Sequence, residues 1–218
     1  MKRIYLYLLA AAFASCGESV NGKTPTITNP DTLEMTTLEM PGGDVVQVPV
    51  RKDSLTRYND VNVKKNCFIV ISKKELRLYV YEKRGNDTVK IAHYPVCLSK
   101  NLGNKQKVGD MKTPESPKGK PFSITQIQNA STWTHDFHDG RGSIKAYGHW
   151  FLRLKTPGHS GIGIHGSTNN ESSVPGRASE GCIRLLDKDI IDLHDKYAFQ
   201  GMNVIIKAEN EGKLSFEK

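Results

Sequence analysis

Residues 177–189 read RASEGCIRLLDKD, and residues 162–167, a short way upstream, read IGIHGS. The small residues next to Cys182 allow a strand and a helix to approach closely and leave backbone N–H groups available. Asp187 is placed to cap a helix, and apolar residues at helical spacing follow as far as Gly201. The stretch therefore predicts a cysteine at the junction between a strand and a helix.

Short apolar runs rich in valine, isoleucine, leucine and tyrosine precede this junction. They lie at residues 67–72, 76–81, 89–99, 121–128, 150–155 and 161–166, with turn signals such as SKKE and KRGND between them, and a last run at 202–207 follows the helix. This pattern predicts a mainly β domain, a β-sandwich or barrel-like core with one principal α-helix after the cysteine.

The composition is consistent with one globular domain. The chain has 218 residues, of which 37% are hydrophobic, so it is too short for two full catalytic domains. Its formal charge of +8 favours an acidic partner such as nucleic acid, a membrane surface or an anionic cell wall, although a basic soluble surface is an equal alternative. No long Lys/Arg run or aromatic-interleaved basic motif indicates nucleic acid.

The N-terminus has the pattern of an export signal. Two positive residues precede an apolar run in MKRIYLYLLAAAFASC, and this run is far shorter than the roughly 20 residues that span a bilayer. We interpret residues 1–15 as a signal peptide. Because Cys16 follows Phe-Ala-Ser, it resembles the lipidated first residue of a bacterial lipoprotein; plain secretion is the alternative.

The stretch that follows Cys16 is poor in aromatic residues and rich in proline and threonine. Such a composition buries too little apolar surface to order itself, so residues 16–60 are interpreted as a lipid-anchored flexible tether. We expect the globular domain at residues 61–210 and a short tail at 211–218. The protein would then work at the periplasmic face of the cell envelope.

The four cysteines have different sequence contexts. Cys67 and Cys97 lie in apolar strand sequence, where they are either a disulfide or two buried thiols. Cys182 has the surroundings of a nucleophile, which needs a base and donors for an oxyanion. His165, at the end of a predicted strand, fits the base. The backbone N–H groups of Gly181 and Cys182 fit the oxyanion hole, and Arg184 could bind a substrate carboxylate.

Several other residues are candidates for the same site. Tyr147 and Trp150 either line a substrate channel or belong to the core, and Ser167 and Ser179 are expected as hydrogen-bond partners near the cysteine. A zinc site is an alternative for the segment STWTHDFHDG, because His135 and His138 are three residues apart. A polar loop over the cleft is favoured there, since no third ligand at a recognisable spacing follows.

The order of these motifs resembles the L,D-transpeptidase family, also called the YkuD domain. The family places a His-Gly pair ahead of Ser-His-Gly-Cys; here His165-Gly166 precedes Ser179-Glu180-Gly181-Cys182-Ile183-Arg184-Leu185. The segments KELRLYVYE, GDMKTPESPKGKPFSI and GMNVIIK also match in order, so that the resemblance covers about residues 67–207.

The resemblance implies a specific chemistry. The cysteine attacks the carbonyl between meso-diaminopimelate and the terminal D-alanine of a peptidoglycan tetrapeptide stem, and an amine resolves the thioester to a 3→3 crosslink. Water as acceptor would make the site an L,D-carboxypeptidase. Cys182 would be the nucleophile and His165 the base, and the carbonyl of Gly166 would orient the imidazole. Neither a metal nor an organic cofactor is needed; the partners are stem peptides and, through Cys16, a membrane.

One residue of the motif departs from the family pattern. Glu180 stands where the family has histidine, and a carboxylate there would raise the pKa of the Cys182 thiol unless it pairs with Arg177 or Arg184. An active Cys182 is expected to have a depressed pKa. The alternative is a catalytically weak lipoprotein that binds the cell wall.

Overall fold

The computed structural model describes residues 33–39, 45–51 and 65–217, with side chains from residue 65 onward. The chain forms two compact units, Met1–Arg51 and Lys52–Lys218. In the first, β1 (Leu33–Glu39) pairs antiparallel with β2 (Val45–Arg51). These two strands fall within the expected flexible tether, and the β-branched residues in VVQVPVR favour extended backbone there. The proposed signal peptide and Cys16 lie outside the described residues.

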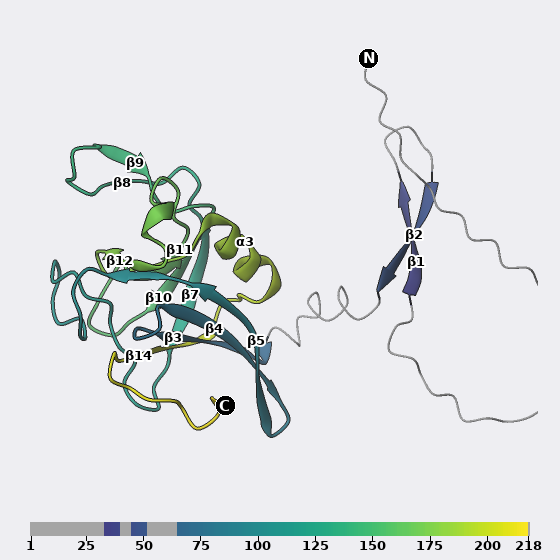
Figure 1. Ribbon diagram of the computed structural model, residues 1–218, viewed down its shortest axis with the longest axis horizontal. Helices are drawn as coiled ribbons and strands as arrows, with labels where there is room; N and C mark the ends of the chain where they lie inside the picture. The colour runs from purple at the N-terminus through teal and green to yellow at the C-terminus, as the bar shows by residue number, and fades with distance from the viewer. Residues whose placement is uncertain (1–32, 40–44, 52–64, 218) are drawn as a thin grey trace, which may run out of the picture. The chain divides into compact units, whose positions relative to one another are not determined.

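The second unit is built on one ten-stranded mixed sheet (Figure 1). Its strand order is β12-β6-β13-β11-β10-β7-β14-β3-β4-β5. The strands are β3 (Cys67–Ser72), β4 (Arg77–Arg84), β5 (Asp87–Pro95), β6 (Cys97–Ser99), β7 (Phe122–Asn129), β10 (Trp150–Lys155), β11 (Gly163–His165), β12 (Gly176–Ser179), β13 (Ile183–Arg184) and β14 (Asn203–Lys207). A separate hairpin of β8 (Thr134–Asp136) and β9 (Ser143–Lys145) stands beside it, and a short 3₁₀ turn, η1, spans Glu171–Ser173. The prediction of a mainly β fold is confirmed.

The predicted apolar runs correspond closely to these strands. The runs at 67–72 and 150–155 are β3 and β10. The run at 89–99 is divided into β5 and β6 because Val96 leaves the β4–β5 ladder and donates its N–H to the carbonyl of Leu76. Cys97, in β6, pairs instead with Arg184 of β13. One continuous run in sequence thus supplies strands at two places in the sheet.

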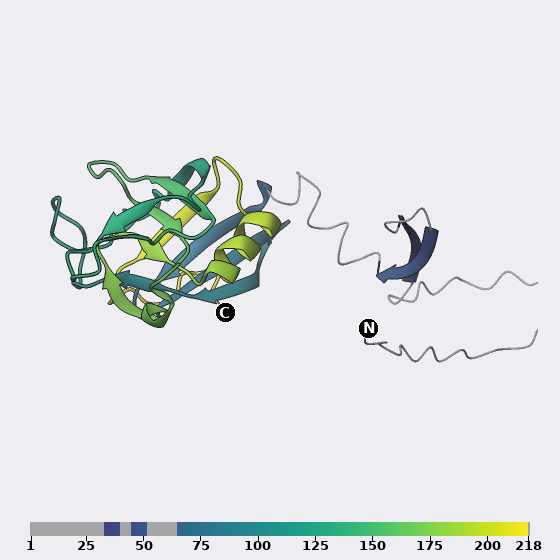
Figure 2. The same ribbon diagram turned by 90° about the horizontal axis from the view of Figure 1, so that it is seen from above.

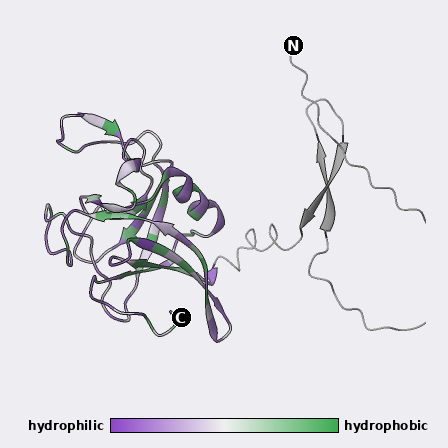
Figure 3. Cartoon of the chain, in the orientation of Figure 1, coloured by the Kyte–Doolittle hydropathy of each residue, from purple (hydrophilic) through white to green (hydrophobic). Residues whose placement is uncertain are grey.

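The principal helix, α3 (Asp187–Lys196), packs across the sheet (Figure 2). It buries Ile190 and Leu193, while its other surface is largely hydrophilic (Figure 3). The prediction that Asp187 caps the helix is wrong: Leu186 is the N-cap residue and makes no side-chain cap. The Asp187 carboxylate instead accepts the N–H of Ser167 at 2.7 Å, which ties the helix start to the loop after β11.

The sheet has apolar side chains on both faces around β3. One face joins the main core with α3, whereas Phe68, Val70 and Tyr81 face the other way. The chain end covers this second face, because the ring of Phe216 lies 5.3 Å from that of Tyr81. A buried ion pair of 2.5 Å between Lys207 and Glu217 fixes the same segment. Residues 214–217 are therefore packed against the domain, whereas residues 211–213 are exposed.

Two further findings concern the cysteines and membrane spans. Cys67 and Cys97 are both buried, and no disulfide joins them among the described residues. Burial raises the pKa of Cys67 to about 11, which keeps it a thiol. No helix in the described part of the chain is long and apolar enough to cross a membrane.

Candidate active site

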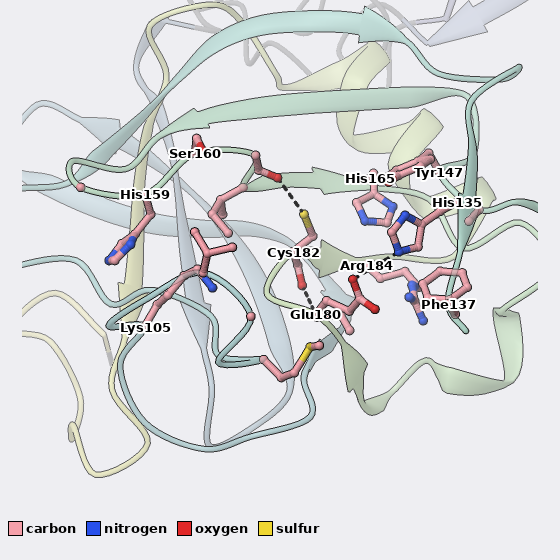
Figure 4. A pocket seen from close by; sticks show the side chains of 18 residues that line it. Lys105, His135, Phe137, Tyr147, His159, Ser160, His165, Glu180, Cys182 and Arg184 are labelled. Atoms are coloured by element: carbon pink, nitrogen blue, oxygen red, sulfur yellow. Dashed lines mark hydrogen bonds and ion pairs between the residues drawn. The ribbon is translucent and has the colours of Figure 1, made fainter. Parts of the chain in front are cut away.

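Cys182 and His165 line one cavity of about 430 Å³, here called the Cys182 cavity (Figure 4). Its walls come from the ends of β11 and β13, from the β8–β9 hairpin and residues 146–147 after it, and from the loops at residues 105–111 and 158–162. The cavity contains the predicted nucleophile and the predicted base. The sequence motifs that suggested a Cys/His site therefore meet in space.

The sheet register places these residues beside one another. β11 pairs in parallel with β13, with Ile164 opposite Ile183 and His165 opposite Arg184. Cys182 immediately precedes β13. Because β10 covers the other edge of β11, His165 is on a strand held from both sides. The base is consequently fixed by backbone hydrogen bonds as well as by side-chain packing.

The His165 ring is held in one orientation. It stacks on Phe151 with ring centroids 5.6 Å apart, and its Nδ1 lies 2.7 Å from the carbonyl oxygen of Gly166. Since a carbonyl only accepts, Nδ1 carries the hydrogen and Nε2 of the neutral ring keeps its lone pair. Burial, with the nearby Arg184 charge, lowers the pKa of His165 to about 3. The imidazole is therefore neutral at pH 7 and can accept a proton at Nε2.

The turn that carries Cys182 is closed by Ser179. The Ser179 hydroxyl donates to the carbonyl of Cys182 at 2.6 Å and accepts the Gly181 N–H at 3.3 Å. Gly181 has φ +142°, and a Cβ there would lie 3.0 Å from the carbonyl oxygen of Lys112. Only glycine fits this position without strain. The Gly181 N–H predicted for the oxyanion hole is shared with Ser179.

The Cys182 thiol is protonated at rest. Its Sγ donates to the carbonyl of Gly161 at 3.3 Å. Burial raises the pKa of Cys182 against the opposing effects of the Gly163 N–H, Arg184 and Arg153, and Glu180 raises it further. The expectation of a depressed thiol pKa is wrong, because the desolvation of the thiolate outweighs the nearby positive charges. Cys182 and His165 are thus both neutral at rest in the cavity that they line.

Glu180 is paired, but with a different partner from those expected. Its Oε2 lies 3.2 Å from Nε2 of His135, which belongs to β8. Arg177 instead donates to the carbonyl of Lys73, and Arg184 donates to the Ser173 hydroxyl at 2.9 Å. Sequence reasoning could not foresee this contact, because His135 is 45 residues away on a separate hairpin.

The other predicted site residues fall into two groups. Arg184, Tyr147 and Ser179 line the Cys182 cavity, and the ring of Tyr147 lies 4.9 Å from that of His165. Ser167 and Trp150 are not among the described lining residues. Ser167 is fully buried, and Trp150 stacks on His194 of α3 with centroids 3.7 Å apart.

Gly166 has a packing role in addition to its carbonyl. A Cβ at Gly166 would lie 2.7 Å from the Cα of Gly148. The two backbones therefore touch, and this contact brings the segment that carries Tyr147 against the end of β11. The Gly166 N–H also donates to the Tyr147 carbonyl at 2.8 Å.

Sequence reasoning missed one wall of the cavity, the loop at residues 105–111. Lys105, Val108 and Met111 line the cavity from this loop. The loop is organised around Asp110, whose carboxylate accepts the Lys105 ammonium at 2.9 Å and backbone N–H groups that include that of Gln106. The polar segment GNKQKVGDMK has no periodicity that would reveal such a cluster.

The histidines of the suggested zinc site do not converge. The His135 ring contacts Glu180, whereas the His138 side chain is 88% exposed. Within the described residues, no group of three His, Cys, Asp or Glu side chains is placed to hold a metal ion.

Comparison with known proteins agrees with this geometry. The family profile of the L,D-transpeptidase catalytic domain, YkuD, matches residues 67–206. The chain belongs to this family. A search of curated proteins gives no match. The chain thus has the fold and the motif order of the family that its sequence resembled.

Solved structures similar to this L,D-transpeptidase domain include Bdellovibrio bacteriovorus Bd1075, with 22% identity, a TM-score of 0.47 and coverage of 68% of this chain and 50% of that one. An L,D-transpeptidase from Mycobacterium smegmatis has 18% identity, a TM-score of 0.46 and coverage of 66% and 59%. The helical cell shape determining protein Pgp2 from Campylobacter jejuni has 18% identity, a TM-score of 0.46 and coverage of 66% of this chain and 48% of that one. The matched region thus spans about half to three fifths of these chains.

Proposed function

We propose that this protein is a peptidoglycan L,D-transpeptidase that works through a Cys182 acyl-enzyme on tetrapeptide stems, releases D-alanine and forms 3→3 crosslinks. Membership of the YkuD family supports the reaction class. The observation that carries the proposal is the fixed His165 ring, whose Nδ1–H bond to Gly166 leaves Nε2 as a base in the cavity of Cys182.

Acylation starts from the neutral pair. Cys182 Sγ leaves the Gly161 carbonyl and attacks the stem carbonyl while its proton passes to His165 Nε2. The Cys182 N–H, with the Gly181 N–H that Ser179 shares, stabilises the oxyanion. The C–N bond then breaks and the proton goes to the departing amine of D-alanine. A ring with a low pKa surrenders that proton readily.

Arg184 is assigned to the substrate. It is 3% exposed and lines the cavity beside His165, and its Nε has no hydrogen-bond partner among the described residues. A buried guanidinium group with an unused donor favours a carboxylate ligand. We assign it to a carboxylate of the stem peptide, and we assign Tyr147, which covers the His165 ring, to the adjoining wall.

The place of action is part of the proposal. The signal-like residues 1–15 and the lipoprotein-like Cys16 favour a lipid-anchored protein at the periplasmic face of the envelope. Labelled palmitate incorporated into the wild type and lost in Cys16→Ser would support the anchor. Equal labelling, or labelling of neither protein, would contradict it.

The activity is tested with purified disaccharide-tetrapeptides and the full chain in detergent, compared with Cys182→Ala. Mass spectrometry should find loss of D-alanine and crosslinked dimers only with the wild type. Release of D-alanine without dimers would identify a carboxypeptidase at the same site. No product from folded wild type would contradict the proposal.

A further inference from the structure

Glu180 occupies an unusual place for a carboxylate. It lies two residues before the nucleophile and lines the Cys182 cavity, and its side chain is 34% exposed there. A carboxylate in this position raises the pKa of the Cys182 thiol, so it does not assist formation of the thiolate. Its position needs another explanation.

The charges around the cavity separate into two kinds. Among the described residues that line it, Glu180 is the only one with a carboxylate. The Lys105 ammonium is already bound by Asp110 at 2.9 Å, and Arg184 is available to a substrate carboxylate. A cationic group that enters the cavity therefore has one acidic side chain to bind among the described lining residues, and that side chain lines the same cavity as the Cys182 sulfur.

His135 keeps the Glu180 carboxylate in place. Its Nε2 donates to Oε2 at 3.2 Å, and its ring packs on Phe137 with centroids 4.5 Å apart. This contact uses one carboxylate oxygen and leaves the other for a ligand. In Figure 4 the Glu180 carboxylate lies between the His135 ring and the Cys182 turn.

A second cavity adjoins the same place. It has a volume of about 320 Å³ and shares Phe137 and Arg184 with the Cys182 cavity. Its other lining residues include Lys100 and Asn170. Its one carboxylate among the described lining residues, Asp139, is bound by Arg141 at 2.7 Å. Cys182 and Glu180 line only the first cavity, so the shared side chains Phe137 and Arg184 are what connects the two.

We propose that Glu180, positioned by His135, binds the ammonium group of the acceptor stem and thereby selects an amine over water for attack on the thioester. The inference rests on the proposed transpeptidase function and assigns the acceptor side of that site. His135 is a positioning residue, and Glu180 is the acceptor-binding residue. A carboxylate favours an ammonium ion over neutral water through a charge-assisted hydrogen bond.

The step balances as follows. The docked ammonium loses one proton to solvent, and its nitrogen attacks the thioester carbon of acyl-Cys182. The new C–N bond forms and the C–S bond breaks. The second proton passes through Nε2 of His165 to the sulfur, which regenerates the Cys182 thiol. The products are the amide crosslink, the resting enzyme and one proton in solvent.

The test measures the ratio of crosslinked dimer to hydrolysed tripeptide with disaccharide-tetrapeptide as both donor and acceptor. This ratio does not depend on the fraction of active protein. We expect Glu180→Gln, which keeps the shape without the charge, to lower the ratio about tenfold. Release of D-alanine in the first turnover should not fall, because loss of the carboxylate removes a charge that raises the pKa of the Cys182 thiol.

His135 is tested with a graded pair of variants. His135→Leu should lower the ratio about threefold, and His135→Gln, which keeps an N–H donor, should restore it to within about twofold of wild type. The matched control is His138→Asn on the same hairpin, whose exposed side chain should leave the ratio unchanged.

The outcomes separate the two proposals. If folded wild type releases no D-alanine, the proposed function fails. If wild type forms dimers and Glu180→Gln keeps the same ratio, or loses first-turnover release as strongly as crosslinking, the function stands and the acceptor site is overturned. Wild type that only hydrolyses the stem also overturns it.

Discussion

His165 and His135 both reach the Cys182 cavity, but they come from different kinds of structure. His165 lies on β11 in the middle of the large sheet and is 4% exposed. His135 lies on the separate β8–β9 hairpin, and its side chain is 33% exposed. The buried ring lines the same cavity as the Cys182 thiol, while the half-buried ring contacts the Glu180 carboxylate. The proposed base therefore lies on the wall formed by the sheet, and the residue that positions Glu180 lies on the wall formed by the hairpin.

The largest expected effect is that of changing His165, on the wall formed by the sheet. His165→Gln removes the base but keeps a polar side chain, and we expect the rate of D-alanine release to fall by about 10³-fold, within the range for a lost general base. Single-turnover release measured by mass spectrometry checks this. A loss below about tenfold would show that His165 is not the base.

An added methyl group should destabilise the protein more where the backbone packs against the end of β11 than in the turn of the hairpin. In Gly148→Ala the new Cβ would lie 2.7 Å from the Cα of Gly166, so we expect a loss of about 3 kcal/mol in the free energy of unfolding. The matched control is Gly140→Ala near the hairpin. Gly140 also has positive φ but nothing within 4 Å, and its loss should be about 1 kcal/mol. Urea unfolding measures both, and equal losses would contradict the close contact.

A smaller effect concerns pH. The pKa of His165 is lowered to about 3 when folded, so between pH 6.5 and 3 the unfolded chain binds more protons there and stability falls as the pH falls. His165→Gln should make the stability loss over this window shallower than in the wild type. Urea midpoints measured from pH 7 to 4 check the slope. Identical slopes would show that His165 is not held neutral by burial.

The contrast between the walls also explains what the sequence could reveal. The sequence runs that form β3, β10 and β14 are recognisable from their apolar residues, because strands buried in a sheet consist largely of such residues. His165 and Cys182 could be placed because the family motifs lie on β11 and just before β13. The hairpin and the loop at residues 105–111 carry polar residues that form contacts far apart in sequence, such as that of His135 with Glu180.

At Asp187 the local sequence predicts a helix cap, but the side chain makes a tertiary contact instead. An aspartate before an apolar helix pattern normally indicates a cap, yet its carboxylate binds the loop at Ser167 and Thr168. The two uses draw on the same ability of a carboxylate to accept N–H and O–H donors. Tertiary contact decided between them, and a single sequence contains no record of that contact.

The hydrogen bond from Cys182 to the Gly161 carbonyl has a consequence for the lifetime of the enzyme. Peroxides oxidise thiolates far faster than thiols, and a sulfur oxidised to the sulfinic state is lost as a nucleophile. Because burial keeps Cys182 protonated, the idle protein presents little thiolate to oxidants. In the proposed reaction the thiol loses its proton to His165 only as it attacks a bound stem peptide, so the raised pKa that slows its ionisation also protects the sulfur between turnovers.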